Sequence, residues 1–400
     1  MRDAIWHDGR CTWLGWVPDS TGASGGPVVA ALGPDLYFGT AGIGLYLALL
    51  TTIGDDPLQR RCAVGALRQA VARAAEPKAA IGLYDGIAGV AHAALVGGSA
   101  LGREELVAGG LDLLGPLAER PIHGPALDMF GGRAGAIVVL LDAADRFDRP
   151  DLLDTAVRYG RELAAAARRD TGHACWDTVT VPVVRPLLGY SHGASGIACA
   201  LIALAEVTGD GEFRALGLEG LAYEHELIDR ESGAWPDFRA ETAGRPPMNA
   251  WCHGAPGAAL ALLRVRSALG TSAGIEDDLE LALSATAGWL DGVEAPNYSL
   301  CHGAGGNAEV LLLAAELLGR GELRERAVAV AAEGIARYHE RAVPWPCGLP
   351  PAATVPGLMV GTAGIGHFLL RAHDPAAIPS ILSVWPESLA MPGRRAATAP

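Results

Sequence analysis

The 400-residue sequence lacks the features that mark several other classes of protein. Its N-terminus, MRDAIWHDG, has no apolar segment like that of a secretion signal, and no run reaches the roughly 18 uninterrupted apolar residues that a membrane span needs. The seven cysteines form no regular close pairs, and their odd number fits reduced thiols or a metal site better than a set of disulfides. We therefore expect a cytoplasmic protein without a membrane span.

The charge of the chain and its lack of linkers indicate which partners and how many domains to expect. Only 19% of the residues are charged, and the formal net charge of −14 argues against nucleic-acid binding while leaving room for basic peptide partners. Half of the residues are apolar, and no long linker rich in serine, proline or charge interrupts them. We predict a single domain over residues 1–400, with repeats from about residue 35 to 375 and a C-terminal tail over residues 376–400.

A short pattern, Gly-x-x-Gly followed by an apolar helical run, recurs seven times. The copies start at Gly39, Gly86, Gly132, Gly193, Gly254, Gly303 and Gly361. These starts lie about 46 to 61 residues apart, which is enough chain for two helices and two loops in each repeat. The sequence therefore predicts seven helical hairpins.

The two helices of each predicted hairpin differ in polarity. Segments that follow the motif, such as residues 135–141 and 196–204, are apolar nearly all round and are expected to be buried inner helices. Segments between them, such as residues 58–73 and 323–336, have one charged face and are expected to be outer helices. An all-α fold satisfies both patterns if it forms an α/α toroid, a ring of inner helices inside a ring of outer ones.

Reactive residues precede the glycine in only some of the repeats. If every inner helix starts at its motif, the residues just before the motifs lie at the same end of the toroid. Repeats three to six carry Asp128, His192, Cys252 with His253, and Cys301 with His302. The other repeats carry Tyr37 and Phe38, Tyr84 and Asp85, and Met359 and Val360. Packing alone does not demand this asymmetry, which indicates a functional site.

The two Cys-His-Gly sequences predict a metal site. Two cysteine thiolates and one imidazole are a usual set of zinc ligands, and three protein ligands leave the fourth tetrahedral position for water or substrate. The simpler interpretation is a pair of buried cysteines with nearby core histidines, but the matching placement in adjacent repeats favours zinc. Spacing alone leaves the choice between His253 and His302 open.

The motifs SHGASGI, WCHGAPG and CHGAGGN, inside a sevenfold repeat, resemble those of the lanthionine synthetase C-like cyclases over nearly the whole chain. WCHGAPG, CHGAGGN and the closing PGLMVGTAGIG are most similar to the cyclase domains of class II lanthipeptide synthetases. The resemblance implies that Cys252, Cys301 and His302 bind zinc, so that it favours His302 over His253. It also places the family's SHG histidine at His192 and its third-repeat acid at Asp128.

The implied reaction assigns roles to these residues. Addition of a thiolate to a dehydroamino acid builds an enolate, which must be protonated at its α-carbon near neutral pH. His192 is the expected proton donor, and Asp128 would orient it or hold it charged. The alternatives are a core histidine and a helix-capping aspartate. For His253, a second proton donor and a partner of the metal ligands remain equal alternatives.

Three features depart from the pattern or remain open. Many stand-alone members of the family carry an arginine where this chain has Met248, so stabilisation of the enolate is weakened unless Arg245 or another base replaces it. The long segments 169–188 and 231–250 either bind substrate or are ordinary decoration. Trp251 and Trp345 line a peptide groove or belong to the core.

The resemblance implies a cyclase that acts on a dehydrated precursor peptide, with the dehydratase on a separate polypeptide. One alternative keeps the chemistry but adds a thiol such as glutathione to dehydroamino acids in proteins. A second alternative is a non-catalytic peptide-binding scaffold, which the absent arginine at Met248 favours and the retained cysteines disfavour. Prenyl transfer would need a basic pocket for a diphosphate, and the repeat ends show almost no Lys or Arg beyond Arg133.

Overall fold

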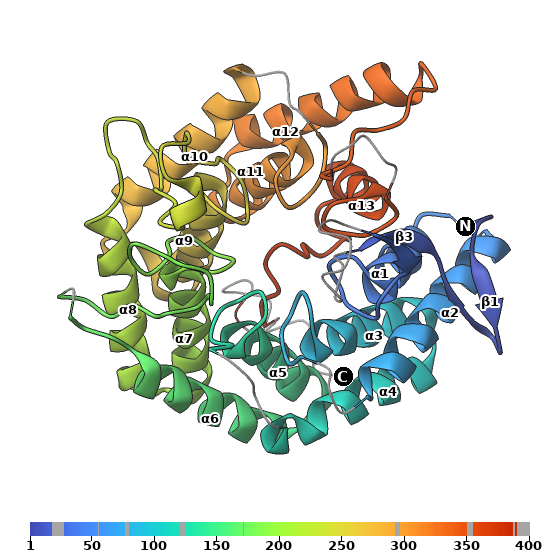
Figure 1. The fold of residues 1–400 in the computed structure, drawn as a ribbon, viewed down its shortest axis with the longest axis horizontal. Coiled ribbons are helices and arrows are strands. Elements are labelled where there is room, and N and C mark those ends of the chain that lie inside the picture. The colour runs from blue at the N-terminus through green and yellow to red at the C-terminus, as the bar shows by residue number, and fades with distance from the viewer. Residues whose placement is uncertain are drawn as a thin grey trace. The chain divides into compact units, whose positions relative to one another are not determined.

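Helices dominate the computed structural model (Figure 1). The structure describes residues 1–17, 28–54, 56–76, 80–120, 125–170, 172–292, 297–349, 355–386 and 389. The predicted tail over residues 376–400 therefore lies partly outside the described residues. No described helix is both long enough and apolar enough to cross a membrane.

Each of the seven motifs starts an inner helix, as predicted. The helices begin at the residue directly after the first glycine of the motif, and they are α1 Thr40–Leu50, α3 Ile87–Leu101, α5 Arg133–Phe147, α7 Ala194–Thr208, α9 Ala255–Leu269, α11 Ala304–Leu318 and α13 Thr362–His373. In α1 and α3 nearly every side chain is buried, which accounts for sequences that are apolar all round.

The loop before an inner helix folds back over the first turn of that helix. In α3 the amides of Ile87, Ala88 and Gly89 donate to the carbonyls seven residues earlier, at 2.8, 3.3 and 3.2 Å. These bonds occupy N–H groups that have no partner inside the helix, so that no capping side chain is needed. A Cβ at Gly89 would lie 1.7 Å from the carbonyl oxygen of Leu83, so the second glycine of the motif permits this close approach.

The amphipathic segments form outer helices, also as predicted. They are α2 Pro57–Ala74, α4 Glu104–Leu114, α6 Pro150–Ala166, α8 Gly211–His225, α10 Glu276–Gly292 and α12 Gly321–Gly334. Helices α1 to α10 pack as consecutive inner and outer pairs (Figure 1). Among the described residues no outer helix follows α13, and beyond it only the single residue Leu389 is helical, so the seventh predicted hairpin has an inner helix but no described outer one.

Part of the predicted tail belongs to the core. Leu382 and Trp385 are buried, and the carbonyl of Leu382 accepts a hydrogen bond from the indole Nε1 of Trp251 at 3.1 Å. The buried guanidinium of Arg264 donates to the Ser383 hydroxyl at 2.8 Å. These contacts explain why an apolar sequence after the last repeat is ordered.

The chain divides into two compact units. One comprises Met1–Leu117, Ala295–Gly305 and Ala329–Pro379, and the other comprises Ala118–Glu294, Gly306–Val328 and Ser380–Pro400. The prediction of a single domain over residues 1–400 stays a prediction.

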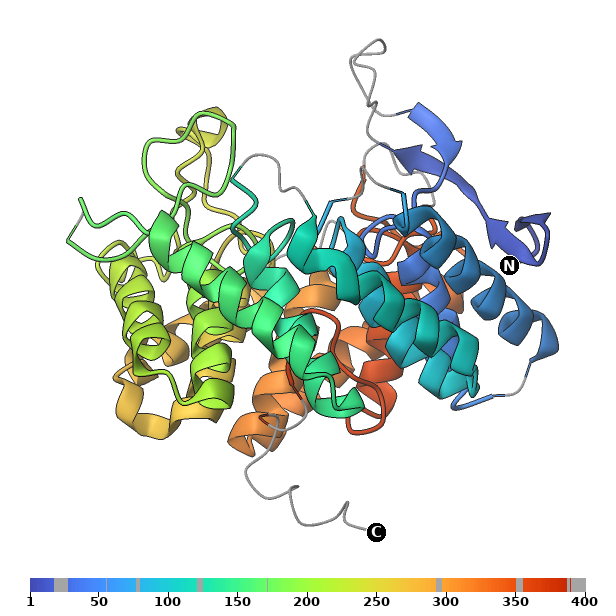
Figure 2. The same ribbon diagram turned by 90° about the horizontal axis from the view of Figure 1, so that it is seen from below.

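Short strands occur near the N-terminus, in the first unit. β1 Ile5–His7 pairs antiparallel with β2 Arg10–Thr12, and β3 Leu14–Val17 pairs with β4 Val28–Ala31. The register of the first pair places Trp6 opposite Cys11. β2 packs against α2, and Figure 2 shows the strands on that side of the unit.

Candidate functional site

The loop before α9 differs from the other motif loops. Gly254, the residue before the helix, has φ 123° and ψ −170°, a backbone conformation that L side chains rarely adopt. The amide of Ala250 donates to the carbonyl of His253 at 3.1 Å, and a Cβ on Gly254 would lie 2.1 Å from the carbonyl oxygen of Met248. This tight turn therefore requires glycine, and it carries Cys252 and His253 at its tip.

The loop before α11 holds Cys301 and His302 through backbone hydrogen bonds. The amide of Cys301 donates to the carbonyl of Met359 at 2.9 Å. The Nε2 atom of His302 lies 2.7 Å from the carbonyl oxygen of Gly348. Since a carbonyl oxygen can only accept, Nε2 carries the hydrogen and the lone pair of Nδ1 points away from this bond. The imidazole is thus held in the tautomer that coordinates a metal through Nδ1.

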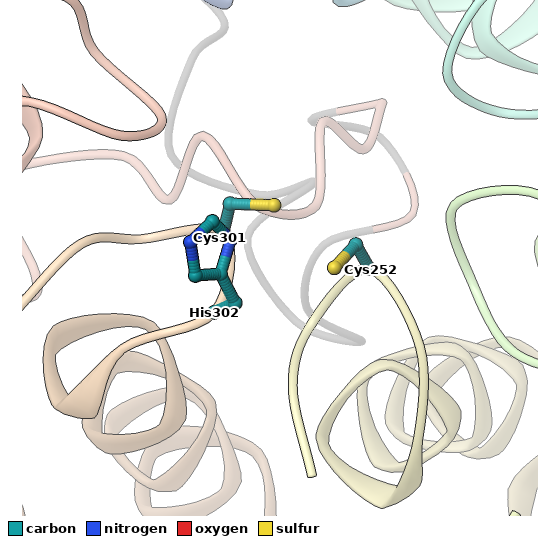
Figure 3. Close-up of side chains that lie close together, drawn as sticks. All are labelled: Cys252, Cys301 and His302. Carbon is teal, nitrogen blue, oxygen red and sulfur yellow. The ribbon is translucent and has the colours of Figure 1, made fainter. Parts of the chain in front are cut away.

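Cys252, Cys301 and His302 form a candidate metal centre. One ligand atom from each of these residues lies within 4.8 Å of the other two, and no other such group of His, Cys, Asp or Glu was found among the described residues. In Figure 3 the two thiols extend toward each other beside the imidazole. Tetrahedral zinc with bonds of about 2.0 to 2.3 Å separates its ligands by about 3.5 Å, so a small inward movement would suit the ion. The donor set and its spacing fit zinc.

His192 forms a close pair with Asp128. Its Nδ1 lies 2.6 Å from Oδ2 of the aspartate, so Nδ1–H donates to a carboxylate that is almost fully buried. The other oxygen of Asp128 accepts the amide of Gly131 at 2.8 Å. Asp128 therefore braces its own loop and orients the histidine, but it does not cap α5, whose N-cap is Gly132 without a side-chain hydrogen bond. The imidazole is 24% exposed, with Nε2 as its remaining site for proton exchange.

His253 stacks on His192 rather than joining the cysteine cluster. The ring centroids are 5.7 Å apart and the ring planes differ by 28°. Burial lowers the pKa of His253, and the charge of Arg239 lowers it further, whereas the Cys252 thiolate acts in the opposite direction. Near neutral pH these effects favour an uncharged imidazole at His253.

Two residues that support the His192 loop were not identified from the sequence. The hydroxyl of Thr178 donates to the carbonyl of His192, which ties the long segment 169–188 to this loop. The carboxylate of Glu224, on the outer helix α8, accepts the amides of Gly189 at 2.8 Å and Ser195 at 2.6 Å. Burial raises the pKa of Glu224 to about 7. Thr178 lies in a segment whose length was a signal, but nothing in the sequence distinguishes Glu224.

An arginine acts on the same region from the other long segment. Arg239 makes a two-pronged ion pair with Asp237, with its Nε at 3.0 Å and its Nη2 at 2.6 Å from the carboxylate. The amide of Val184 donates to the carbonyl of Phe238 at 2.8 Å, so the two long segments are joined beside this pair. The charge of Arg239 acts on both Cys252 and His253. Arg245, the basic residue to which the sequence pointed, is exposed.

The two tryptophans have different roles. Trp251 is completely buried and its indole donates to a backbone carbonyl, so a groove-lining role for this residue is wrong and the core interpretation holds. Trp345 is partly exposed and packs edge-on against Tyr298, with ring centroids 5.2 Å apart. It lies three residues before Gly348, whose carbonyl orients His302.

Comparisons with known proteins address the fold and the family of the chain. The solved structure of nisin cyclase is similar over 89% of this chain and 91% of its own, with a TM-score of 0.64 and 17% sequence identity. This similarity confirms the predicted all-α toroid fold. A mannanase from Salegentibacter sp. is less similar, with a TM-score of 0.48 and 12% identity over 73% of this chain and 88% of its own.

The sequence comparisons address the family directly. Comparison with curated proteins found no match. The family described as lanthionine synthetase C-like protein matches residues 30–383, which is most of the chain. The protein therefore belongs to the lanthionine synthetase C-like family.

Proposed function

We propose that the protein is a zinc-dependent cyclase. It adds cysteine thiols of a ribosomally made peptide to dehydroalanine or dehydrobutyrine, and it forms lanthionine and methyllanthionine thioether rings. The observation that carries the proposal is the grouping of Cys252, Cys301 and His302, because three ligands leave one coordination position for a substrate thiol. Family membership and the nisin cyclase fold support the same chemistry.

The chain would hold zinc through the Sγ atoms of Cys252 and Cys301 and the Nδ1 atom of His302. The Gly348 carbonyl supports this assignment, since it takes the hydrogen of Nε2 and keeps the ring in the required tautomer. Bound zinc would supply Lewis acidity that favours the thiolate form of the substrate cysteine near neutral pH.

His192 delivers the proton in the proposed reaction. The substrate sulfur bonds to the β-carbon of the dehydroamino acid, and the electron pair of the carbon–carbon double bond moves toward the adjacent carbonyl as an enolate. Nε2–H of His192 then protonates the α-carbon, while Asp128 keeps Nδ1 occupied and the ring oriented. The proton lost by the thiol replaces the one delivered, through solvent, so the reaction consumes no other reagent.

Arg239 stabilises the negative charge that develops on the enolate in this proposal. Its ion pair with Asp237 fixes one side of the guanidinium, and its charge reaches the Cys252–His253 turn. Arg239 would thus be the other base that replaces the arginine absent at Met248, whereas Arg245 is exposed. His253, stacked on His192 and favoured in its neutral form, is a positioning partner in this scheme.

The proposed partners are a dehydrated precursor peptide and a separate dehydratase, in the cytoplasm. The second candidate function keeps the same residues but uses an external thiol such as glutathione. It is favoured only by the same metal cluster, which does not distinguish a thiol within the peptide from one outside it. A non-catalytic scaffold would have no use for the oriented pair of His192 and Asp128.

The proposal is tested by incubating a dehydrated, cysteine-containing peptide with the purified protein and zinc. An alkylating agent is then added and the peptide mass is measured, because cyclised cysteines resist alkylation. The expected product is unalkylated at the mass of the starting peptide, and Cys301→Ala should yield only alkylated peptide. With glutathione present, a peptide heavier by one glutathione would favour the second candidate. Full alkylation of the peptide in the assay of the parent protein, with no glutathione adduct when glutathione is present, would contradict both catalytic functions.

A further inference from the structure

A basic cavity lies beside the N-terminal β-hairpin, in the first compact unit. It has a volume of about 510 Å³ and is formed by the turn between β1 and β2, the helix α2 and the start of α4. Four arginines line it, and we call it the arginine pocket: Arg60, Arg61, Arg68 and Arg103. Its volume falls within the range of about 300 to 1,000 Å³ that is usual for ligand sites.

An aromatic side chain forms one wall of the arginine pocket. The indole of Trp6 packs against α2 where Gly65 leaves room, since a Cβ on Gly65 would lie 2.7 Å from the ring. The guanidinium of Arg61 lies over the same indole, 4.4 Å from the ring centroid. Trp6 thereby holds an exposed arginine head group in a defined position at the edge of the cavity.

The charges of the arginine pocket are only partly compensated. Arg68 pairs with Glu105 at 2.9 Å, and Asp8 is the one acidic residue in the lining. Within the part of the chain that the structure describes, Arg61 and Arg103 form no ion pair. Like charges held together repel, so their grouping in a chain of net charge −14 favours a negatively charged ligand.

The surroundings of the cavity favour a peptide over a small anion. Three of the four arginines lie on α2 and the fourth directly precedes α4, so the positive charge is spread over two helices and suits several carboxylates better than one small anion. Among the described residues β1 pairs only with β2, so its other edge is open to the backbone of an extended chain. The net negative charge of the whole protein suggested a basic partner, but this surface is positively charged and therefore suits an acidic one.

We propose that the arginine pocket binds an acidic segment of the peptide substrate, with carboxylates on Arg61 and Arg103 and an apolar stem against Trp6. The identity of this peptide as a substrate rests on the proposed cyclase function, whereas its binding does not. The pocket would hold the peptide outside the region that reacts, and would therefore raise affinity without taking part in the chemistry.

The test measures binding of fluorescein-labelled hexaglutamate to the full-length protein by fluorescence anisotropy at about 150 mM salt, where exposed charges are well screened. Arg61→Gln with Arg103→Gln should weaken binding tenfold or more, because each lost charge-assisted hydrogen bond is worth about a factor of ten. The matched control is Arg324→Gln with Arg341→Gln, which removes two exposed arginines elsewhere and should change the dissociation constant less than twofold.

Several outcomes decide the proposal. Arg103→Gln alone, at an exposed helix terminus, should still weaken binding severalfold if the double variant does not fold. Absence of binding by the parent, or equal weakening in the pocket and control variants, would overturn the proposal. Displacement of the peptide by inorganic phosphate at the same molar concentration would reassign the pocket to a phosphate group. If the protein binds the acidic peptide but does not cyclise a dehydrated peptide, the arginine pocket is supported and the proposed cyclase function is contradicted.

Discussion

Replacement of His192 by alanine separates proton delivery from metal binding. The side chain contacts Asp128 at 2.6 Å and is not among the three grouped ligands, so the variant should keep its zinc. Cyclisation should slow by roughly 10² to 10⁴, the usual effect of losing a general acid. Some ring formation should survive, because water can protonate the enolate slowly.

The same variant has a defined effect on stability. Asp128 is nearly buried and would lose its charge-assisted bond to His192, although its other oxygen keeps the amide of Gly131. The free energy of unfolding should therefore fall by about 1.5 to 3 kcal/mol. His173→Ala is the matched control, because His173 and Glu226 form a more exposed pair at 3.1 Å whose loss should cost below about 1 kcal/mol.

The assay compares zinc content, cyclisation rate and urea denaturation in His192→Ala and His302→Ala, with the same dehydrated peptide. His302→Ala should lose zinc as well as activity, because it removes one ligand and the bond that orients it to Gly348. Loss of zinc from His192→Ala with retention in His302→Ala would refute the assignment of roles. If both variants cyclise the peptide at the parent rate, another residue donates the proton, and His253 is the next residue to test.

Three further predictions concern the metal, the buried acid and the arginine. Purified protein should contain about one zinc per chain by elemental analysis, and Cys301→Ala should lose it while circular dichroism still reports a helical protein; a zinc-free parent would remove the basis of the mechanism. Because burial raises the pKa of Glu224 from 4.5 to about 7, its protonated form stabilises the fold fully below pH 4.5, and this contribution is lost as pH rises through about 7. In urea denaturation, the free energy of unfolding of Glu224→Gln minus that of the parent should therefore rise by about 3 kcal/mol between pH 4.5 and 8. A difference that does not change with pH would contradict the raised pKa of Glu224. Arg239→Gln should slow cyclisation by about tenfold or more with zinc retained, whereas Arg245→Gln should not, and equal rates for the two variants would show that Arg239 has no role.

The sequence by itself determined where the inner helices begin. The requirement for glycine at Gly89 is local, since any Cβ there would meet the carbonyl of Leu83 six residues earlier. The same short-range contact recurs at other motif glycines, such as Gly196 and Gly364. The starts of the inner helices could therefore be predicted from the repeated motif without any knowledge of the fold. The candidate ligands were found for the same reason, as they directly precede these glycines.

Tertiary structure alone decided how those residues are oriented and what surrounds them. The tautomer of His302 depends on the carbonyl of Gly348, and the orientation of His192 depends on Asp128, 64 residues away. Arg239 reaches the Cys252 turn only because two long segments pair with each other, and no motif marks it. Contacts over such sequence separations arise from the packing of whole repeats, so the motifs that mark His192 and His302 do not by themselves fix the geometry of the groups that orient them.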